Sequence, residues 1–290
     1  MNYLSNPRIR LFIGAFMISF SPVFVSLVNV SPTISGFYRV FFGGLVLTIV
    51  IIASGRRFEF TRSIWMTLIF SALFFTADLW FWHRSILYIG PGLSTLIANM
   101  QVFFMMAAGI ILFKQRPTIT QLFAILIAVL GLVVIVGIDW NGLDSDYRLG
   151  IIFGFLTAIT YTGYMLFMRQ AQINSVYKLP IREIAVMSIL VSLFLALVAV
   201  IEGESLAIPT SSDLLLLLTY GICSHAAGLI LIASSLTKVS TAEVGIVLLL
   251  QPSLSFIWDI LFFNRSIVLI ESLGVLMVLF AIYLGSKRTI

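Results

Sequence analysis

Polar side chains occur in the middle of long apolar runs, where they could bind a polar solute. Asn99 and Gln101 lie near the centre of one run, and Gln251 lies near the centre of another. Hydrocarbon offers an amide no hydrogen-bond partner, so each amide must bond to another helix or face a water-filled cavity. Tyr161 and His225 occupy similar positions in two further runs. These five residues are the candidate solute-binding side chains.

Charged side chains interrupt the apolar runs at Arg39, Asp78 and Asp259. Arg39 and Asp78 lie on consecutive runs, equally far from the short loop between them, which predicts the same depth for both. An ion pair between them would offset the cost of placing each charge in a poorly hydrated region. The pair could be an outer gate or a static clasp, and Arg39 could instead extend towards the outer headgroups. Asp259 could pair with Arg84 or Arg265, or exchange protons as Asp78 could.

The patterns of several other function classes are missing from the sequence. An intramembrane enzyme would need a motif such as G-x-S-G with a histidine, H-E-x-x-H or paired aspartates, and the only histidines are His83 and His225. No acidic residue or cysteine accompanies His225 at ligand spacing, so we expect neither a metal nor a cofactor. No Walker motif predicts direct use of ATP. A channel is also disfavoured, because no segment resembles a selectivity filter or a ring of charges.

The composition indicates the class of the protein. Sixty per cent of the residues are hydrophobic and 10% are charged, whereas a soluble domain has about 45–50% and about 25%. Ten apolar runs are each long enough to cross a bilayer as a helix. They cover about 8–28, 34–54, 63–83, 92–113, 119–138, 149–170, 181–201, 211–233, 241–262 and 267–285. The sequence therefore predicts an all-α integral membrane protein with ten transmembrane helices and no soluble domain.

The distribution of charge predicts the orientation. If the amino terminus is cytoplasmic, most Lys and Arg residues fall on the inner side, and the outer segments hold only Arg84, Arg148 and Arg265. This asymmetry follows the positive-inside rule and places both termini in the cytoplasm. It also explains the basic balance without nucleic acid. Arg8 and Arg10 before an apolar run would suit a signal peptide, but no small-residue cleavage motif follows, so we expect an uncleaved first helix.

One stretch of the sequence occurs twice. The segment 91–137 aligns without a gap with 241–287, which places Gln101 on Gln251. Duplicated membrane units are most often carriers, with the solute bound near the midplane. We therefore divide the chain into two repeats, 1–145 and 146–290. Gly150 and Gly154 form a G-x-x-x-G packing pattern, which is weak as a sign of association, so we expect a monomer or a weak dimer.

Three short segments share patterns with a known group of membrane proteins. They are Phe37-Tyr38-Arg39-Val40-Phe41, Ser85-Ile86-Leu87-Tyr88 before Pro91-Gly92, and Phe113-Lys114-Gln115-Arg116-Pro117-Thr118 followed by Gln121. With these features the whole chain resembles the drug/metabolite transporter (DMT) superfamily, and within it the ten-helix EamA group of bacterial exporters. Gln115 stands where that group commonly has glutamate, and Asn264-Arg265-Ser266 is also atypical.

The resemblance implies two inverted five-helix repeats around a central cavity, with helices 5 and 10 supporting the other eight. It implies a secondary transporter working by alternating access in the bacterial inner membrane. We expect export of a small polar metabolite, above all an amino acid, as in the similar aromatic amino-acid and methyl viologen exporters. A nucleoside-type metabolite, S-adenosylmethionine or a cationic drug is the alternative solute. Proton coupling and facilitated exchange both stay open. The expected partners are the solute, the lipid bilayer and, for coupling, protons.

Overall fold

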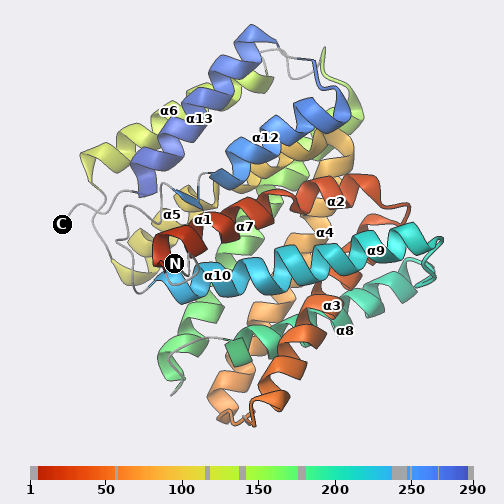
Figure 1. Ribbon diagram of the computed structural model, residues 1–290. Helices are drawn as coiled ribbons and strands as arrows, with labels where there is room; N and C mark the ends of the chain where they lie inside the picture. Colours follow the sequence, from red (N-terminus) through yellow and green to blue (C-terminus); the bar gives the residue numbers. More distant parts are fainter. Residues whose placement is uncertain are drawn as a thin grey trace.

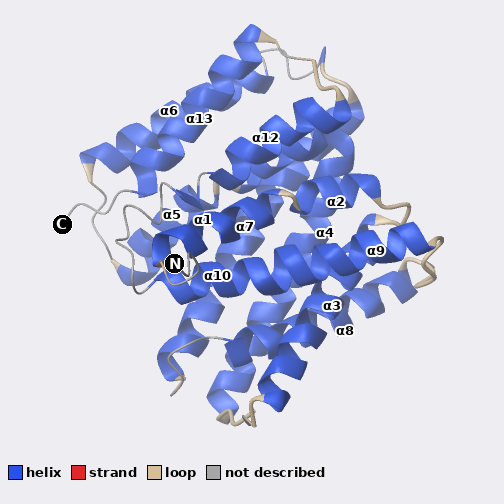
Figure 2. Cartoon of the chain, viewed as in Figure 1, coloured by secondary structure: helices blue, strands red, loops and turns tan. Residues whose placement is uncertain are grey.

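A computed structural model describes the residues 6–55, 58–114, 118–136, 142–175, 181–236, 247–248, 250–266 and 268–286. Within these ranges all regular structure is helical (Figures 1 and 2). The elements are α1 (Pro7–Ser19), α2 (Ser21–Leu27), α3 (Pro32–Ala53), α4 (Arg62–Ala98), α5 (Gln101–Phe113), α6 (Ile119–Val136), α7 (Ser145–Asn174), α8 (Ile181–Ile201), α9 (Ser211–Thr219), the π-helical segment η3 (Tyr220–Ala227), α10 (Gly228–Leu236), α12 (Leu250–Phe263) and α13 (Leu269–Ser286). Each predicted run overlaps at least one of them, which confirms the all-α class; residues 241–246 of the ninth run lie outside the described ranges. The basic turn at 115–117 lies outside the described ranges.

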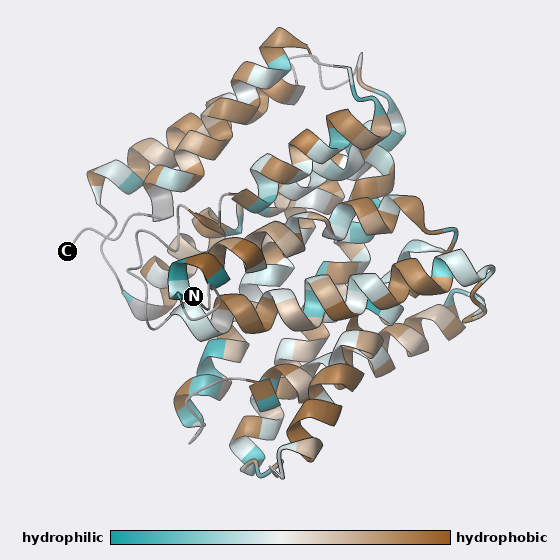
Figure 3. Ribbon diagram, in the orientation of Figure 1, coloured by the Kyte–Doolittle hydropathy of each residue, from teal (hydrophilic) through white to brown (hydrophobic). Residues whose placement is uncertain are grey.

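The helices have the length and surface of membrane spans. Six described segments are long and apolar enough to cross a bilayer, and three shorter apolar helices accompany them. One of the six, Arg62–Leu112, contains both the third and the fourth predicted helices. Many large apolar residues are exposed, and hydrophobic residues predominate along most helices (Figure 3). Such a surface is stable in contact with lipid chains, so the chain is a multi-pass membrane protein.

The packing of the helices has an approximate twofold order. The third helix packs on the sixth (α4 on α7), and the eighth packs on the first (α10 on α1). The second packs on the seventh (α3 on α8), and the fifth packs on the tenth (α6 on α13). Exchanging the two halves reproduces this pattern. Because each half has an odd number of spans, the second half enters the membrane in the opposite direction, which gives inverted repeats.

The pair α6 and α13 meets at glycines. A Cβ atom on Gly131 would lie 2.9 Å from the carbonyl oxygen of Gly274, and one on Gly274 would lie 2.7 Å from that of Gly131. The same 150-residue offset that aligns Gln101 with Gln251 aligns Gly131 with Ala281, and Ala124 with Gly274. Both alanines are fully buried. Small residues at equivalent positions thus let these two helices cross closely, beside the remaining helices (Figure 1).

Three of the predicted helices are interrupted. The first is divided at Phe20, where Pro22 stands in the first turn of α2, and proline cannot donate the hydrogen bond that would continue a helix. The fourth is divided at Asn99 and Met100, between α4 and α5. The eighth contains η3, whose wide turns add a residue to the helix. Breaks of this kind inside a membrane are tolerated where protein or water, rather than lipid, surrounds the backbone.

The third predicted helix ends later than expected. The sequence predicts its end at residue 83, but the helical backbone continues to Gly90, which has φ 82° and ψ 164°. Only glycine adopts that conformation at low cost. Pro91 follows and starts the next helix, so α4 is two helices joined by a one-residue corner. The prediction failed because Arg84 is accommodated within the helix by protein contacts described below.

Candidate functional site

A buried arginine is the centre of the polar interior. Arg39 lies two turns into α3, a helix whose first turn is capped by Ser31, and it is 9% exposed. Its Nη1 donates to the hydroxyl of Tyr220 at 3.1 Å. Its guanidinium also lies over the rings of Trp82 at 5.4 Å and Tyr220 at 5.1 Å. Aromatic faces attract a cation, so this cage compensates in part for lost hydration.

The hydroxyl of Tyr220 continues the contact to a histidine. It lies 3.3 Å from Nε2 of His83, and Nδ1 of that ring lies 2.7 Å from the carbonyl oxygen of Leu79. Both Tyr220 and His83 are fully buried. These two residues were not among the predicted site residues. They come from helices 137 positions apart in the chain, and spacing along one helix could not have paired them.

The predicted ion pair between Arg39 and Asp78 is not formed. Asp78 is buried, with 4% exposure, and its Oδ1 has no hydrogen-bond partner. No ion pair joins the two side chains among the described residues, although the charge of Arg39 acts on Asp78. The equal depth of the two residues was a sound argument for proximity. It could not foresee that Tyr220, from the eighth helix, accepts the hydrogen bond of Arg39.

A second buried pair joins η3 to α8. Nε2 of His225 lies 2.8 Å from the hydroxyl of Ser188, and both side chains are fully buried. A Cβ atom on Gly43 would lie 2.5 Å from the ring of His225, so a glycine of α3 makes room for the imidazole. The structure thus places His225 beside the helix that carries Arg39. Nδ1 of this ring has no hydrogen-bond partner among the described residues.

The predicted amides of the first repeat lie at a helix break. Asn99 follows the last residue of α4, and its Nδ2 donates to the carbonyl oxygen of Thr95 at 2.8 Å. Gln101 is the first residue of α5, which has no side-chain cap, and Gln251 is the second residue of α12. Both glutamines are partly exposed. No side-chain hydrogen bond of either is found among the described residues.

Tyr161 lies on α7. It is partly exposed, and its ring makes an edge contact with Tyr164 at 5.1 Å. Tyr164 in turn packs on Phe75, whose ring is 4.5 Å away. The next residue on α7, Thr162, is buried. The five predicted solute-binding residues therefore lie on different elements, with Asn99 and Gln101 at the break between α4 and α5 and the others on α7, η3 and α12.

A polar cluster joins the start of α3, the part of α4 before its corner at Gly90, and the end of α8, on the side that the charge distribution predicts to be outer. We call Thr33, Trp80, Arg84 and Glu202 the outer polar cluster. Arg84 Nη2 lies 2.8 Å from Glu202 Oε1, and Thr33 donates to Oε2 at 2.6 Å. Trp80 Nε1 also donates to Oε1 at 2.8 Å, and the guanidinium of Arg84 lies 3.8 Å from its ring centre. Arg84 therefore contacts Glu202, Thr33 and Trp80 at the position where the sequence predicted the helix to stop.

The outer polar cluster gives a testable dependence on pH. Partial burial disfavours the charged form of Glu202, but the hydrogen bonds from Thr33 and Trp80 and the charge of Arg84 outweigh it and lower its pKa from 4.5. A lowered pKa in the folded state stabilises the protein fully above the ordinary pKa, and this contribution is lost as the pH falls through the lower folded-state pKa. We therefore expect Glu202→Gln to lower thermal stability at neutral pH, by at most about 1 kcal/mol.

That difference should vanish in acid, below pH 4.5, when melting temperatures of the two proteins are compared in the same detergent. Glu59→Gln is the matched control, because Glu59 is exposed in the loop before α4. Its melting temperature should equal that of the wild-type protein at every pH. A Glu202→Gln deficit that grows as the pH falls would contradict the assignment.

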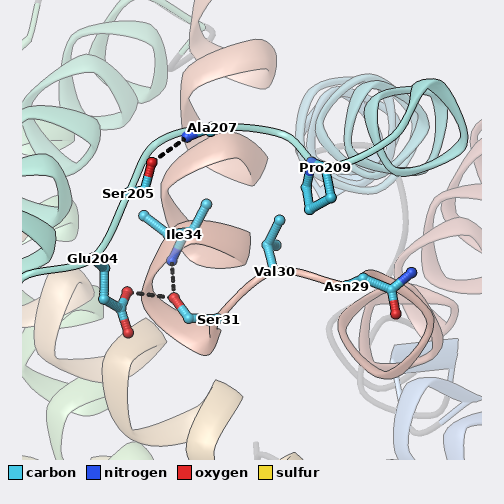
Figure 4. Close-up of a pocket in the computed structure, with 8 residues that line it drawn as sticks. All are labelled: Asn29, Val30, Ser31, Ile34, Glu204, Ser205, Ala207 and Pro209. Carbon is cyan, nitrogen blue, oxygen red and sulfur yellow. Dashed lines mark hydrogen bonds between the residues drawn. The ribbon is translucent and has the colours of Figure 1, made fainter.

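A small surface pocket is lined by two connecting segments and the start of α3 (Figure 4). It has a volume of about 250 Å³ between the α2–α3 link and the α8–α9 link. Ser31 donates to Glu204 at its edge, and Asn29 contacts Asp213 of α9 through its backbone N–H at 2.9 Å. The hydroxyl of Tyr38 donates to the carbonyl oxygen of Leu206 at 2.5 Å. These contacts join the outer ends of the first, second, seventh and eighth helices.

Asp259 has a different environment from the one that proton exchange would suggest. It is 3% exposed, and its Oδ2 accepts from the backbone N–H of Gly92 at 3.0 Å and from Arg265 Nη1 at 3.1 Å. The same Nη1 donates to the carbonyl oxygen of Ile89 at 3.0 Å, and Nη2 pairs with Glu271. We call Asp259, Arg265 and Glu271 the Asp259 cluster. It holds the corner at Gly90, and Arg265 was one of the two predicted partners.

Comparison with known proteins agrees with this architecture. The EamA-like transporter family matches residues 9–137 and again residues 148–286. No curated protein matches the chain. Among solved structures, one titled "Crystal structure of protein" has a TM-score of 0.67 at 14% identity, over 97% of this chain and 96% of that chain. That likeness concerns the fold. Members of the matched family are membrane transporters of the DMT type rather than enzymes. The chain belongs to the EamA-like transporter family.

Proposed function

We propose that the chain is a secondary transporter that exports small polar metabolites, above all amino acids, from the cytoplasm across a bacterial inner membrane. The observation that carries this proposal is the position of Gln101 and Gln251. Equivalent residues of the two repeats, they lie on α5 and α12, are partly exposed, and have no side-chain partner among the described residues. Carriers built from inverted repeats bind their solute between the repeats near the midplane.

The chemistry at the helix breaks suits an amino acid. At the break between α4 and α5 the side chain of Gln101 has no hydrogen-bond partner among the described residues, whereas the N–H groups of Val102 and Phe103 bond to the carbonyl oxygens of Asn99 and Met100. Gln101 and Gln251 add amide donors and acceptors, and Asn99 stands at the same break. The ammonium group of a zwitterion needs hydrogen-bond acceptors, and its carboxylate needs donors. Tyr161 would supply an aromatic wall, which fits a solute with an apolar side chain.

The outer contacts support an alternating-access cycle. The outer polar cluster, together with the pairs at Glu204 and Asp213, holds the outer ends of several helices together. We infer that this conformation is closed on the outer side. Opening it would require these contacts to separate while the inner side closes. Most basic residues would then face the cytoplasm with both termini, and the protein would work as a monomer or a weak dimer without nucleic acid.

The two glutamines provide the test. In proteoliposomes loaded with a mixture of labelled amino acids, we expect Gln101→Leu and Gln251→Leu each to lower the transport rate about tenfold, because each removes a hydrogen bond from a desolvated solute. The double variant should lose more. Gln170→Leu is the matched control, since Gln170 is exposed near the inner end of α7, and it should transport normally. Unchanged transport by the double variant would remove these amides from the site.

A further inference from the structure

The hydrogen bonds that reach Arg39 run in one direction. The carbonyl oxygen of Leu79 can only accept, so Nδ1 of His83 must carry a proton towards it. Nε2 of the neutral ring is then an acceptor, and the Tyr220 hydroxyl donates to it. The oxygen of Tyr220 consequently presents its lone pairs to Arg39, which donates from Nη1 at 3.1 Å. His83 thereby sets the hydroxyl of Tyr220 as an acceptor for the guanidinium.

Arg39 and Asp78 both keep unused hydrogen-bonding capacity. Nε of Arg39 and Oδ1 of Asp78 are buried without a partner among the described residues. A buried carboxylate and a buried guanidinium are each costly alone, and a direct pair would satisfy both. The structure instead shows the guanidinium bonded to a neutral hydroxyl. The pair is therefore available but unformed in this conformation.

We propose that Arg39 is a two-position switch. In this conformation it bonds to Tyr220 of the eighth helix, whose hydroxyl His83 orients. In the alternative conformation it pairs with Asp78 of the third helix. His83 and Tyr220 are positioning residues for Arg39, because they act on it without contacting the solute. This inference rests on the proposed function only in assigning the two conformations to a transport cycle.

The backbone next to the switch provides a fixed point. A Cβ atom on Gly221 would lie 3.0 Å from the backbone nitrogen of Gly43, and one on Gly43 would lie 2.9 Å from the carbonyl oxygen of Gly221. α3 and η3 are thus in direct backbone contact one turn below Arg39. Side-chain exchange at Arg39 can alter the outer parts of these helices while this contact persists.

Distances between spin labels on the two helices test the switch. Leu87 is 58% exposed at the outer end of the third helix, and Ser212 is exposed at the outer end of the eighth. Both would be replaced by cysteine and labelled after Cys223→Ala. In Tyr220→Phe the ring remains but the acceptor is lost, and we expect the ratio of the two distance populations to change about tenfold. Tyr164→Phe is the matched control and should leave the distribution unchanged.

Asp78→Asn distinguishes the second position. Without the carboxylate Arg39 has no second position, so this variant should reduce the second distance population of the labelled parent protein. Combined with Tyr220→Phe, it should cancel the change that Tyr220→Phe causes. A folded Tyr220→Phe protein with an unaltered distribution would overturn the switch, and so would a change that persists in the double variant. These outcomes are independent of transport, which the glutamine variants test separately.

Discussion

Replacing Asp259 with alanine should lower the free energy of unfolding by about 3–5 kcal/mol, the cost of removing one partner of a buried ion pair. The carboxylate is 3% exposed and accepts from Gly92 and Arg265. Its loss would leave a buried N–H unpaired and would reduce the hold of Arg265 on the corner at Gly90. Equilibrium unfolding in mixed micelles, followed by tryptophan fluorescence, measures the effect.

Two comparisons separate this structural role from proton exchange. Asp259→Asn keeps an acceptor oxygen of similar shape, so it should lose much less stability than the alanine variant. Glu271→Gln affects only the other branch of the Asp259 cluster and should also be milder. A stable Asp259→Ala protein whose transport no longer responds to a pH gradient would contradict our prediction and restore Asp259 as a proton-exchanging residue.

Gly221→Val should have the second largest effect, because the added side chain meets backbone that cannot move aside. Its Cβ alone would lie 2.7 Å from Cβ of Phe42 and 3.0 Å from the carbonyl oxygen of Arg39. Overpacking of this kind typically costs about 1–3 kcal/mol. It should also separate Arg39 from Tyr220 and thus reduce transport by the protein that still folds.

The neighbouring residue supplies the control for this variant. Ile222 is 39% exposed and points away from α3, so Ile222→Val should unfold and transport like the wild-type protein. Thermal unfolding in detergent and the proteoliposome assay measure both proteins side by side. If Gly221→Val matched Ile222→Val in stability, the close contact between α3 and η3 would be wrong.

The positions of the helices could be predicted well where apolar runs end at strong boundaries. The run predicted at 181–201 ends where α8 ends, at Ile201, since Glu202 and Gly203 follow. The end of the third helix could not be predicted, because Arg84 stops a helix only if nothing in the protein neutralises it. Its partners Glu202 and Thr33 come from other helices.

The candidate site was predictable only in part, for a similar reason. Charge within apolar sequence identified Arg39, Asp78 and Asp259, and the repeat identified Gln101 and Gln251. Tyr220 and His83 carry no such local signal, since an aromatic residue in a span is ordinary. The contact between them depends on η3, which begins at Tyr220. Apolar periodicity does not distinguish a π-helical segment from an α-helix. The roles of the predicted solute residues stay predictions until transport is measured.

The π-helical segment η3 divides the eighth span into two helices, α9 and α10, with different packing partners. Above it α9 packs with α2 and α3 at the outer face, whereas below it α10 packs on α1. π-helical turns have a looser hydrogen-bond pattern than α-helical turns, so η3 can serve as a hinge within a continuous helix. A bend at η3 would let α9 tilt relative to α10 while α10 stays packed on α1. The chain would then need no loop at the membrane centre to permit this motion.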